Sequence, residues 1–223
     1  MDVAGQWREG ILFPRWAEWA NWGFGEPRFI FYPPLSWMFG ALLGSLLPWS
    51  SVALVFNLCA QTFAGVSAYA LLRRLVDSRY AARIGAACYA ANPYALLIVY
   101  MRSDFAELLA IAFYPLLLLA SLSLGGILSG QRPGGRFPAV GMFGACFALV
   151  WLSNAPAAVL ATYSVGLLFL FAAVYRRSAA PMLNGALGLA LGFCLGAFYL
   201  LPAIYEQRWV NISGALQIGR AHV

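Results

Sequence analysis

The chain has 223 residues, of which 62% are hydrophobic and 10% are charged, and its formal net charge is +6. In soluble globular domains roughly a quarter of the residues are charged. The composition therefore excludes an ordinary soluble domain and predicts an all-α, polytopic transmembrane helix bundle. All fourteen basic residues are Arg, and the single histidine is His222, so chemistry that depends on imidazole is scarcely available. We expect the lipid bilayer as a partner, and no nucleic acid.

Both ends of the sequence are predicted to differ from those of the native protein. The last six residues, IGRAHV, are the translation of a common sequencing adapter, so residues 218–223 are not expected to belong to the gene. Met1 opens directly into a segment with the character of an extracytoplasmic loop, and a membrane span is needed to carry such a loop across. We therefore expect Met1 to be an internal methionine, with at least one transmembrane helix before it.

Residues 1–50 are predicted to form an extracytoplasmic loop with interfacial and re-entrant helices. This stretch holds six of the eight Trp. In PRWAEWANW, the spacing of Trp16, Trp19 and Trp22 predicts an aromatic stripe on a short helix that lies in the membrane interface, with Arg15 and Glu18 at its polar edge. Membrane anchoring would explain the stripe, and so would Trp rings that stack on a sugar.

The apolar segment 35–47 is predicted to dip into the membrane without crossing it. Thirteen residues at 1.5 Å each reach about 20 Å, whereas the hydrocarbon core is about 30 Å thick. Pro33 and Pro34 favour a helix start here, because proline fixes φ and lacks a donor that a first turn would leave unpaired. A segment that does not cross keeps Glu26 and Arg28 on the outer side.

Apolar runs long enough to span a membrane are predicted at 51–72, 81–101, 106–124, 138–153, 156–175 and 182–203. The connections between them alternate in charge. Those at 73–83, 125–137 and 175–181 hold eight Arg and one acid, whereas the N-terminal stretch and the connections at 101–107, 152–155 and 204–217 hold five Arg and seven acids. Because cytoplasmic loops collect Arg, this pattern predicts about six spans within 51–217 and an outer N-terminal stretch.

The four cysteines are predicted to be buried small hydrophobes rather than metal ligands. Each lies within an apolar run, and none forms a CxxC pair; they are Cys59, Cys88, Cys146 and Cys194. We name no residue as a metal ligand.

The most informative polar cluster lies in VYMRSDFAELLAIAFYPLLLLA, where Arg102, Asp104 and Glu107 separate two predicted spans. The two acids, at positions i and i+3, share a helix face, and charges are costly where lipid and protein crowd together. One explanation is structural, because Asp104 followed by Glu107 resembles a capping box. The other is functional: a carboxylate pair, with Arg102 beside it, that faces an anionic lipid-linked substrate.

Other polar residues are predicted to join this cluster on the outer face. Asn154, in WLSNAPAAV, fits either a tight turn or a substrate contact. Glu206 and Arg208 follow the last span, where an exposed pair is the simplest expectation. A cleft here would combine cations for phosphate, carboxylates for base or metal chemistry and aromatic rings for a sugar. The candidate catalytic residues are Asp104, Glu107 and Glu26, and the candidate substrate-binding residues are Arg15, Arg28, Arg102, Tyr32, Asn154, Glu206 and Arg208.

The serial order of several motifs resembles the bacterial membrane proteins of the 6-pyruvoyl-tetrahydropterin synthase-related family. These motifs are PRW, GFGEPRFIFYPPL, RSDFAELLAIAFYPL, WLSNAPAAVLATY and FYLLPAIYEQRWV, and the resemblance covers nearly all of 1–217. The family is similar in turn to the GT-C class of integral membrane glycosyltransferases. The resemblance implies a location in the bacterial inner membrane and a first outer loop with a catalytic acid and membrane-associated helices. By position, Asp104 matches an acid at the outer end of the following helix pair.

The sequence also departs from these relatives. In GT-C proteins the principal acid lies just after the first span, a region that would precede Met1, and Glu26 matches only a position within the loop. The soluble pterin synthase needs a histidine-bound zinc, which this chain cannot supply, so pterin chemistry is not expected.

These inferences lead to one main hypothesis and two alternatives. The main hypothesis is an inverting GT-C-type glycosyltransferase that passes a sugar from a polyprenyl-phosphate donor to an extracytoplasmic acceptor, with a divalent metal ion as an open possibility. The alternatives are a transporter or flippase of lipid-linked sugar and a non-catalytic membrane assembly protein. The chain shows no inverted repeat of Gly- or Pro-broken helices, which disfavours the transporter.

Overall fold

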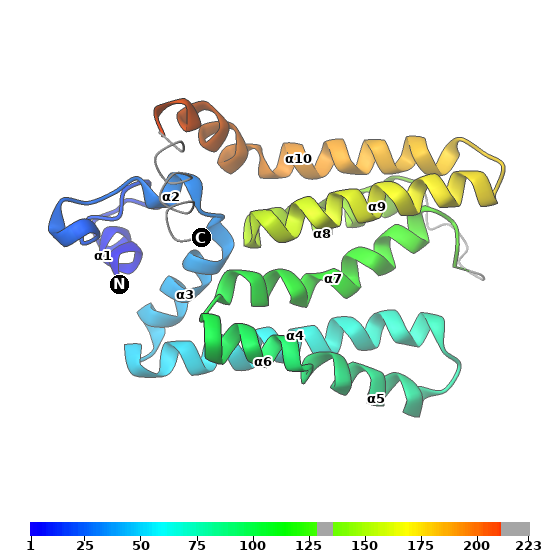
Figure 1. The fold of residues 1–223 in the computed structure, drawn as a ribbon, viewed down its shortest axis with the longest axis horizontal. Coiled ribbons are helices and arrows are strands. Elements are labelled where there is room, and N and C mark those ends of the chain that lie inside the picture. Colours follow the sequence, from blue (N-terminus) through cyan, green and yellow to red (C-terminus); the bar gives the residue numbers. More distant parts are fainter. Residues whose placement is uncertain (129–135, 211–223) are drawn as a thin grey trace, which may run out of the picture.

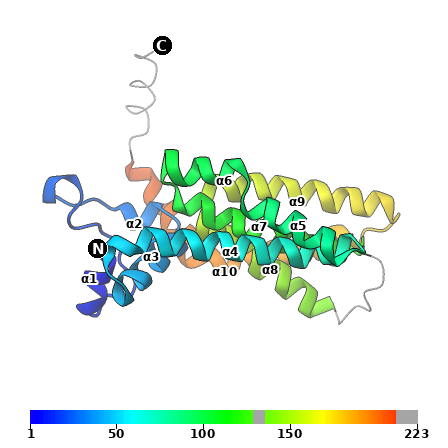
Figure 2. The ribbon, with the colours of Figure 1, turned by 90° about the horizontal axis from the view of Figure 1, so that it is seen from below.

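A computed structural model describes residues 1–128 and 136–210 of the chain. The described part is built from helices: α1 (Asp2–Arg8), η1 (Asn21–Gly23), α2 (Arg28–Phe31), α3 (Pro34–Leu46), α4 (Trp49–Leu75), α5 (Arg79–Ala90), α6 (Pro93–Leu97), η2 (Ile98–Arg102), α7 (Phe105–Leu124), α8 (Arg136–Ser153), α9 (Ala155–Tyr175), α10 (Ala180–Glu206) and η3 (Gln207–Trp209). Helices α4 to α10 lie side by side, and α1 to α3 gather at one end of them (Figures 1 and 2). The prediction of an all-α helix bundle is confirmed.

Five helical segments in the described residues are long and apolar enough to cross a membrane: Trp49–Leu75, Arg79–Arg102, Phe105–Leu124, Ala155–Tyr175 and Ala180–Trp209. The chain is therefore a multi-pass membrane protein. The remaining predicted span, 138–153, corresponds to α8, whose apolar part Phe137–Ser153 is shorter and reaches about 25 Å at 1.5 Å per residue. The count of six crossings stays a prediction.

Two of the three predicted Arg-rich connections lie together at the end of the bundle opposite α1 to α3. The α4–α5 and α9–α10 connections both turn at this end (Figure 1), and they carry Arg73, Arg74, Arg79, Arg83, Arg176 and Arg177. Arg132 and the predicted adapter residues 218–223 lie outside the described residues. The acidic connections turn at the other end, so the described connections follow the predicted alternation of charge. We call the end with α1 to α3 the outer end, after the side of the membrane predicted for it.

Proline starts α3 as the sequence indicated. Pro33 precedes the helix, Pro34 is its first residue, and the helix ends at Leu46. The two prolines have φ values suited to a first turn and no N–H that would be left unpaired there. Whether this thirteen-residue helix dips into a membrane stays a prediction.

Helix α8 lies at the centre of the bundle, between α7 and α10. Its Phe143 and Phe147 are fully buried, and both rings pack onto glycines of α10. A Cβ atom on Gly188 would lie 2.3 Å from Cδ1 of Phe143, and one on Gly192 would lie 2.5 Å from Cδ1 of Phe147. Glycine therefore permits the close approach of α10 to α8, as small residues do in membrane helix pairs.

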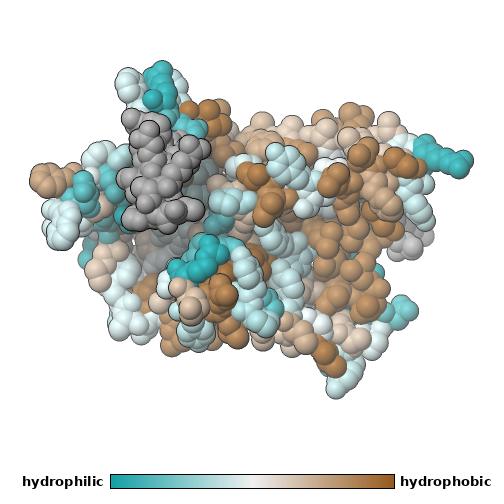
Figure 3. All heavy atoms as spheres, in the orientation of Figure 1, coloured by the Kyte–Doolittle hydropathy of each residue, from teal (hydrophilic) through white to brown (hydrophobic). Residues whose placement is uncertain are grey.

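The prediction that the cysteines are buried is correct only for Cys146. The other three, Cys59, Cys88 and Cys194, are exposed on the surface of the bundle. On the face seen in Figure 3, hydrophobic residues cover much of the bundle. Because a helix that faces lipid is apolar on all sides, an apolar sequence context does not tell which face a cysteine occupies.

The predicted helix with a tryptophan stripe is not formed. Trp16 and Trp19 lie in non-helical chain, and Trp22 lies in the three-residue η1 with φ +60°. Ala17 and Glu26 instead form an antiparallel bridge with N···O distances of 2.8 and 3.1 Å. Four residues between them have positive φ, a conformation that interrupts an α-helix; they are Asn21, Trp22, Gly23 and Gly25.

Candidate functional site

The Arg102–Asp104–Glu107 cluster lies where the chain turns between η2 and α7 at the outer end. The π-helix η2 ends at Arg102, and Ser103 follows in the left-handed conformation with φ +51°. Asp104 then begins α7 as its N-cap. A π-helical turn and a non-glycine residue at positive φ both cost free energy and are enriched at functional sites. Here they turn the chain between Arg102 and the two acids that it contacts.

The structural explanation for the acids is half correct. Asp104 Oδ1 accepts a hydrogen bond from the Glu107 backbone N–H at 3.0 Å, as in a capping box. A capping box has a second hydrogen bond, from the Asp104 N–H to the Glu107 side chain. That bond is not formed, because the Asp104 N–H donates to the Ile98 carbonyl oxygen at 3.2 Å. The Glu107 side chain instead makes an ion pair with Arg102, Nη1 to Oε2 at 2.8 Å, and accepts a hydrogen bond from the Tyr94 hydroxyl at Oε1.

The two carboxylates therefore differ in what they can still bind. The Glu107 side chain is 16% exposed, and both of its oxygens have strong partners. The Asp104 side chain is 28% exposed, and its Oδ2 has only the long contact to Arg102 Nη2 at 3.5 Å. Asp104 thus keeps acceptor capacity for a further donor, whereas Glu107 is better placed to hold Arg102.

A cavity of about 310 Å³ lies beside this cluster, between α6, α7 and α9; we call it the small cavity. Asn154 lines it and also caps α9, because its Oδ1 accepts from the Ala157 N–H at 3.0 Å. The explanation that Asn154 serves a turn is therefore correct, and the residue also lines the small cavity. The lining is Tyr94, Arg102, Asp104, Glu107, Ile111, Tyr114, Asn154, Pro156, Ala157 and Leu160.

A second cavity, of about 780 Å³, lies on the other side of Arg102 and Asp104, towards α3 and the start of α4; we call it the large cavity. Arg28 and Tyr32, from the N-terminal stretch, line it together with Trp37 and Trp49. Arg102 and Asp104 line both cavities. The structure therefore brings six predicted residues to adjoining walls: Arg28, Tyr32, Arg102, Asp104, Glu107 and Asn154.

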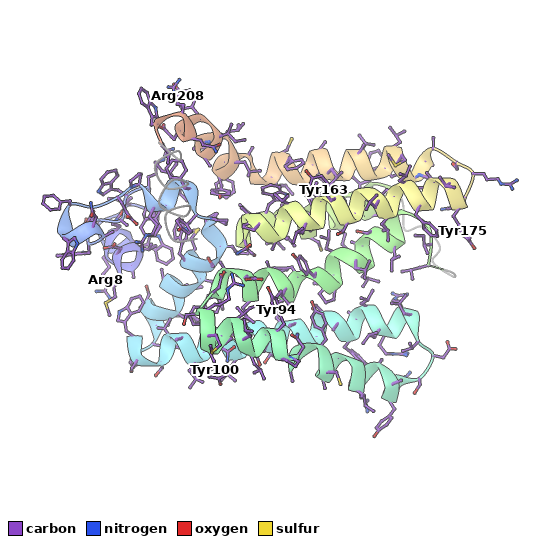
Figure 4. The ribbon with its side chains drawn as sticks, in the orientation of Figure 1. Arg8, Tyr94, Tyr100, Tyr163, Tyr175 and Arg208 are labelled. Carbon is purple, nitrogen blue, oxygen red and sulfur yellow. The ribbon has the colours of Figure 1, made fainter. Side chains whose placement is uncertain are left out.

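The other candidates do not line these two cavities. Glu26 makes an ion pair with Arg28, so its observed contact is one that positions Arg28. Arg15 is exposed. Arg208 lies 3.9 Å from the centroid of the Tyr205 ring and makes no described ion pair with Glu206. Figure 4 shows Arg208 beyond α10 and Tyr94 beside α7, with other helices between them.

A divalent metal ion does not fit the described residues of the cluster. Asp104 and Glu107 both face the Arg102 guanidinium, which already supplies the positive charge between them. No group of three or more His, Cys, Asp and Glu gathers within 1–128 and 136–210. No step of the chemistry below is routed through a metal.

Sequence reasoning did not identify the tyrosines around Glu107. Tyr94 lies thirteen positions before Glu107, on the other side of the η2 turn, and no periodic pattern joins two residues across such a break. Tyr114 donates to the Ala157 carbonyl oxygen at 2.9 Å and thereby ties α7 to α9 beside the small cavity. The sequence Asn92-Pro93-Tyr94 carries a usable signal for Tyr94, because Asn92 caps α6 and so fixes where the residues that follow it lie.

Comparisons with known proteins identify no relative: no protein-family model, no curated protein and no solved structure matches the chain.

Proposed function

We propose that this protein is an integral membrane glycosyltransferase of GT-C type, which transfers a sugar from a polyprenyl-phosphate donor to an extracytoplasmic acceptor in the bacterial inner membrane. The observation that carries the proposal is that one carboxylate and one guanidinium, those of Asp104 and Arg102, line two adjoining cavities. Such an arrangement suits an inverting displacement at a sugar carbon, because the acceptor and the leaving phosphate then lie on opposite sides of the reacting carbon.

The large cavity suits the donor phosphate. Arg28 and Arg102 both line it, and guanidinium groups bind phosphate oxygens with two parallel hydrogen bonds. When the bond between the sugar C1 and the phosphate oxygen breaks, the bonding electrons stay on that oxygen, and the lipid phosphate gains a negative charge. The two arginines would stabilise the charge as it develops, which is where such stabilisation increases the rate.

Asp104 suits the role of general base towards an acceptor hydroxyl in the small cavity. Its Oδ2 has only one long contact, so it can accept the hydroxyl proton while the acceptor oxygen bonds to C1. Glu107 would act as a positioning residue, because its oxygens hold Arg102 and accept from Tyr94. Attack from the side opposite the phosphate inverts the configuration at C1.

The test is a transfer assay with the full-length protein in membrane vesicles. Polyprenyl phosphates that carry labelled mannose, glucose or N-acetylglucosamine are supplied as donors, and label is followed into lipid, glycan and protein fractions. Asp104→Asn is expected to lower transfer at least a hundredfold, since general-base catalysis contributes about 10²–10⁴-fold. Arg15→Gln, which changes an outer charge away from both cavities, is expected to transfer like the wild type.

One result would overturn the proposed function, and a second would overturn the role of Asp104 in it. Wild-type transfer of no donor, accompanied by movement of intact donor across the bilayer, would establish the flippase alternative, because a flippase leaves the glycosidic bond unbroken. Unchanged transfer in Asp104→Asn that inserts normally would remove Asp104 from the chemistry.

A further inference from the structure

A cavity of about 360 Å³ lies on the surface of the bundle between α4 and α5; we call it the α4–α5 groove. The two helices lie side by side and turn at the end opposite the outer end, which we call the inner end (Figure 1). The groove shares no lining residue with the small or the large cavity. Its wall is almost wholly apolar and includes Gly65 and Val66 of α4 and Ala86, Ala87 and Ala90 of α5.

Small residues make the α4–α5 groove narrow and deep enough to hold a chain. A Cβ atom built on Gly65 would lie 3.4 Å from the Cβ of Ala90 and 3.9 Å from the Ala86 carbonyl oxygen, so the helices approach closely along its floor. On α4 the groove extends from Gln61 to Tyr69, a rise of about 12 Å at 1.5 Å per residue. It follows the helix axes, which in membrane proteins lie close to the direction of the lipid chains.

Arginines surround the inner end of the groove. Arg83 lines the groove there, and Arg79 lies four positions before it on α5. On α4, Arg73 lies four positions after the lining residue Tyr69. Because residues four apart share a helix face, Arg73 and Arg79 continue the line of the groove beyond its end. The Arg73 guanidinium also contacts two carbonyl oxygens of the α4–α5 connection, at 3.3 and 3.5 Å, which holds it at this turn.

The positive charge at this end is not neutralised by the described part of the protein. Residues 73–83 contain four Arg and a single acid, Asp77. Within 1–128 and 136–210, the ion pairs join Arg28 and Arg102 to acids at the outer end, and none involves Asp77 or an arginine of this connection. An apolar groove that ends among free guanidinium groups complements a molecule with an apolar chain and an anionic head. Basic pockets between membrane helices bind anionic lipid headgroups in this way.

We propose that the α4–α5 groove binds an anionic phospholipid, with an acyl chain between the helices and the headgroup phosphate among Arg73, Arg79 and Arg83. Guanidinium groups bind phosphate oxygens with paired hydrogen bonds. An acyl chain gains little by leaving other acyl chains, which are as apolar as the groove, so the headgroup charge sets the selectivity. A transmembrane helix, about 10–12 Å across, would cover the groove without supplying an anion to the arginines. The proposal is independent of the proposed transfer reaction.

The charged end and the apolar groove can be altered separately. Arg83→Gln removes one positive charge from the groove. Arg177→Gln is its control, because Arg177 is also an exposed arginine of an inner connection and does not line the groove. Ala87→Phe places a ring in the groove, since Ala87 is exposed and lines it. Ala81→Phe is the matched control, because Ala81 is exposed on the same helix outside the groove.

The experiment is native mass spectrometry of the full-length, delipidated protein in detergent micelles, titrated with phosphatidylglycerol or phosphatidylcholine of the same chain length. Phosphatidylglycerol is expected to bind at least fivefold more tightly than phosphatidylcholine. Arg83→Gln is expected to weaken phosphatidylglycerol binding about fivefold, the factor that corresponds to about 1 kcal/mol per basic residue beside anionic lipid. Ala87→Phe is expected to weaken binding of both lipids at least threefold, and both control variants are expected to bind like the wild type.

Equal binding of the two lipids by the wild type would overturn the proposal, as would equal phosphatidylglycerol binding by Arg83→Gln and the wild type. Phosphatidylglycerol binding that Ala87→Phe leaves unchanged would show that the arginines hold a phosphate without a chain in the groove, which also contradicts it. The same spectra report the oligomeric state. A lipid-free dimer that Ala87→Phe dissociates would show that a helix of a second copy covers the groove, and the lipid site would then be refuted.

Discussion

The centre of the bundle and its outer end are packed in opposite ways. At the centre, Phe143 and Phe147 of α8 are fully buried against glycines of α10, with no space for another carbon atom. At the outer end, by contrast, Gly40 of α3 faces open space, and tryptophans and charged residues line two cavities that share a wall. Glycine therefore allows two helices to approach closely in one region and borders an unfilled volume in the other.

This difference separates a scaffold from a site. Interior packing at crystal-like density fixes where helices lie, and α8 with its phenylalanines holds α7, α9 and α10 together. The outer end keeps features that lower stability, including the π-helical turn of η2 and Ser103 at positive φ. Such features persist where the surrounding structure holds them, and they are concentrated at functional sites.

The largest predicted effect compares the two kinds of glycine directly. Gly192→Leu forces a side chain into Phe147, whose Cδ1 lies 2.5 Å from the position of the new Cβ, and is expected to destabilise the protein by about 3 kcal/mol, at the upper end for overpacking. Gly40→Leu is expected to leave stability unchanged or to raise it. Denaturant titration of both variants in mixed micelles measures the contrast, and equal destabilisation would contradict it.

A smaller effect is predicted at the polar cluster. Arg102→Met leaves Asp104 and Glu107 as neighbouring negative charges without the guanidinium between them. Because these side chains are partly exposed, the expected loss is about 1–2 kcal/mol, below the 3–5 kcal/mol typical of a fully buried pair. Adding Glu107→Gln is expected to recover part of the loss. A double-mutant cycle that shows no coupling between the two sites would mean that the ion pair contributes nothing.

The scaffold was easier to predict from the sequence than the site. Apolar runs mark the helices, and Pro33-Pro34 marks the start of α3, because length, hydropathy and proline chemistry act locally. Local signals failed where several backbone angles depart from the helical region together. The spacing of Trp16, Trp19 and Trp22 is that of a helix face. Asn21 and Trp22 have positive φ, however, so no helix forms that would align the three rings.

Part of the site could be predicted, because Arg102, Asp104 and Glu107 are close in sequence and share one turn. Contacts between distant elements could not. Tyr94 reaches Glu107 only because η2 reverses the chain, and Tyr199 of α10 donates to the Phe31 carbonyl oxygen at 2.9 Å across 168 positions. Likewise, Arg208 was expected to lie with the cluster, but its guanidinium lies over the neighbouring rings of Tyr205 and Trp209.

Asn154 is expected to contribute about 1 kcal/mol, since replacing an Asn cap by Ala costs roughly that amount. Asn154→Ala should show this loss, whereas Asn154→Ser should recover most of it because serine also caps. If Asn154 only caps α9, transfer activity should follow stability across the two variants. If the serine variant is stable but slow, the side chain also contacts substrate in the small cavity, and the outer end depends on it for more than folding.

The smallest effect is predicted at Ser103, where a gain rather than a loss is expected. Its φ of +51° is unfavourable for serine and carries no such penalty in glycine, although glycine has more freedom to lose on folding. Ser103→Gly is therefore expected to stabilise the protein by about 0.5 kcal/mol, and Ser103→Val to destabilise it by more than that. If the strained turn positions Arg102 between the two cavities, Ser103→Gly should lower transfer while it raises stability. Activity that rises with stability would show instead that the strain at Ser103 has no function. This turn would then resemble the core, where the packing serves stability alone.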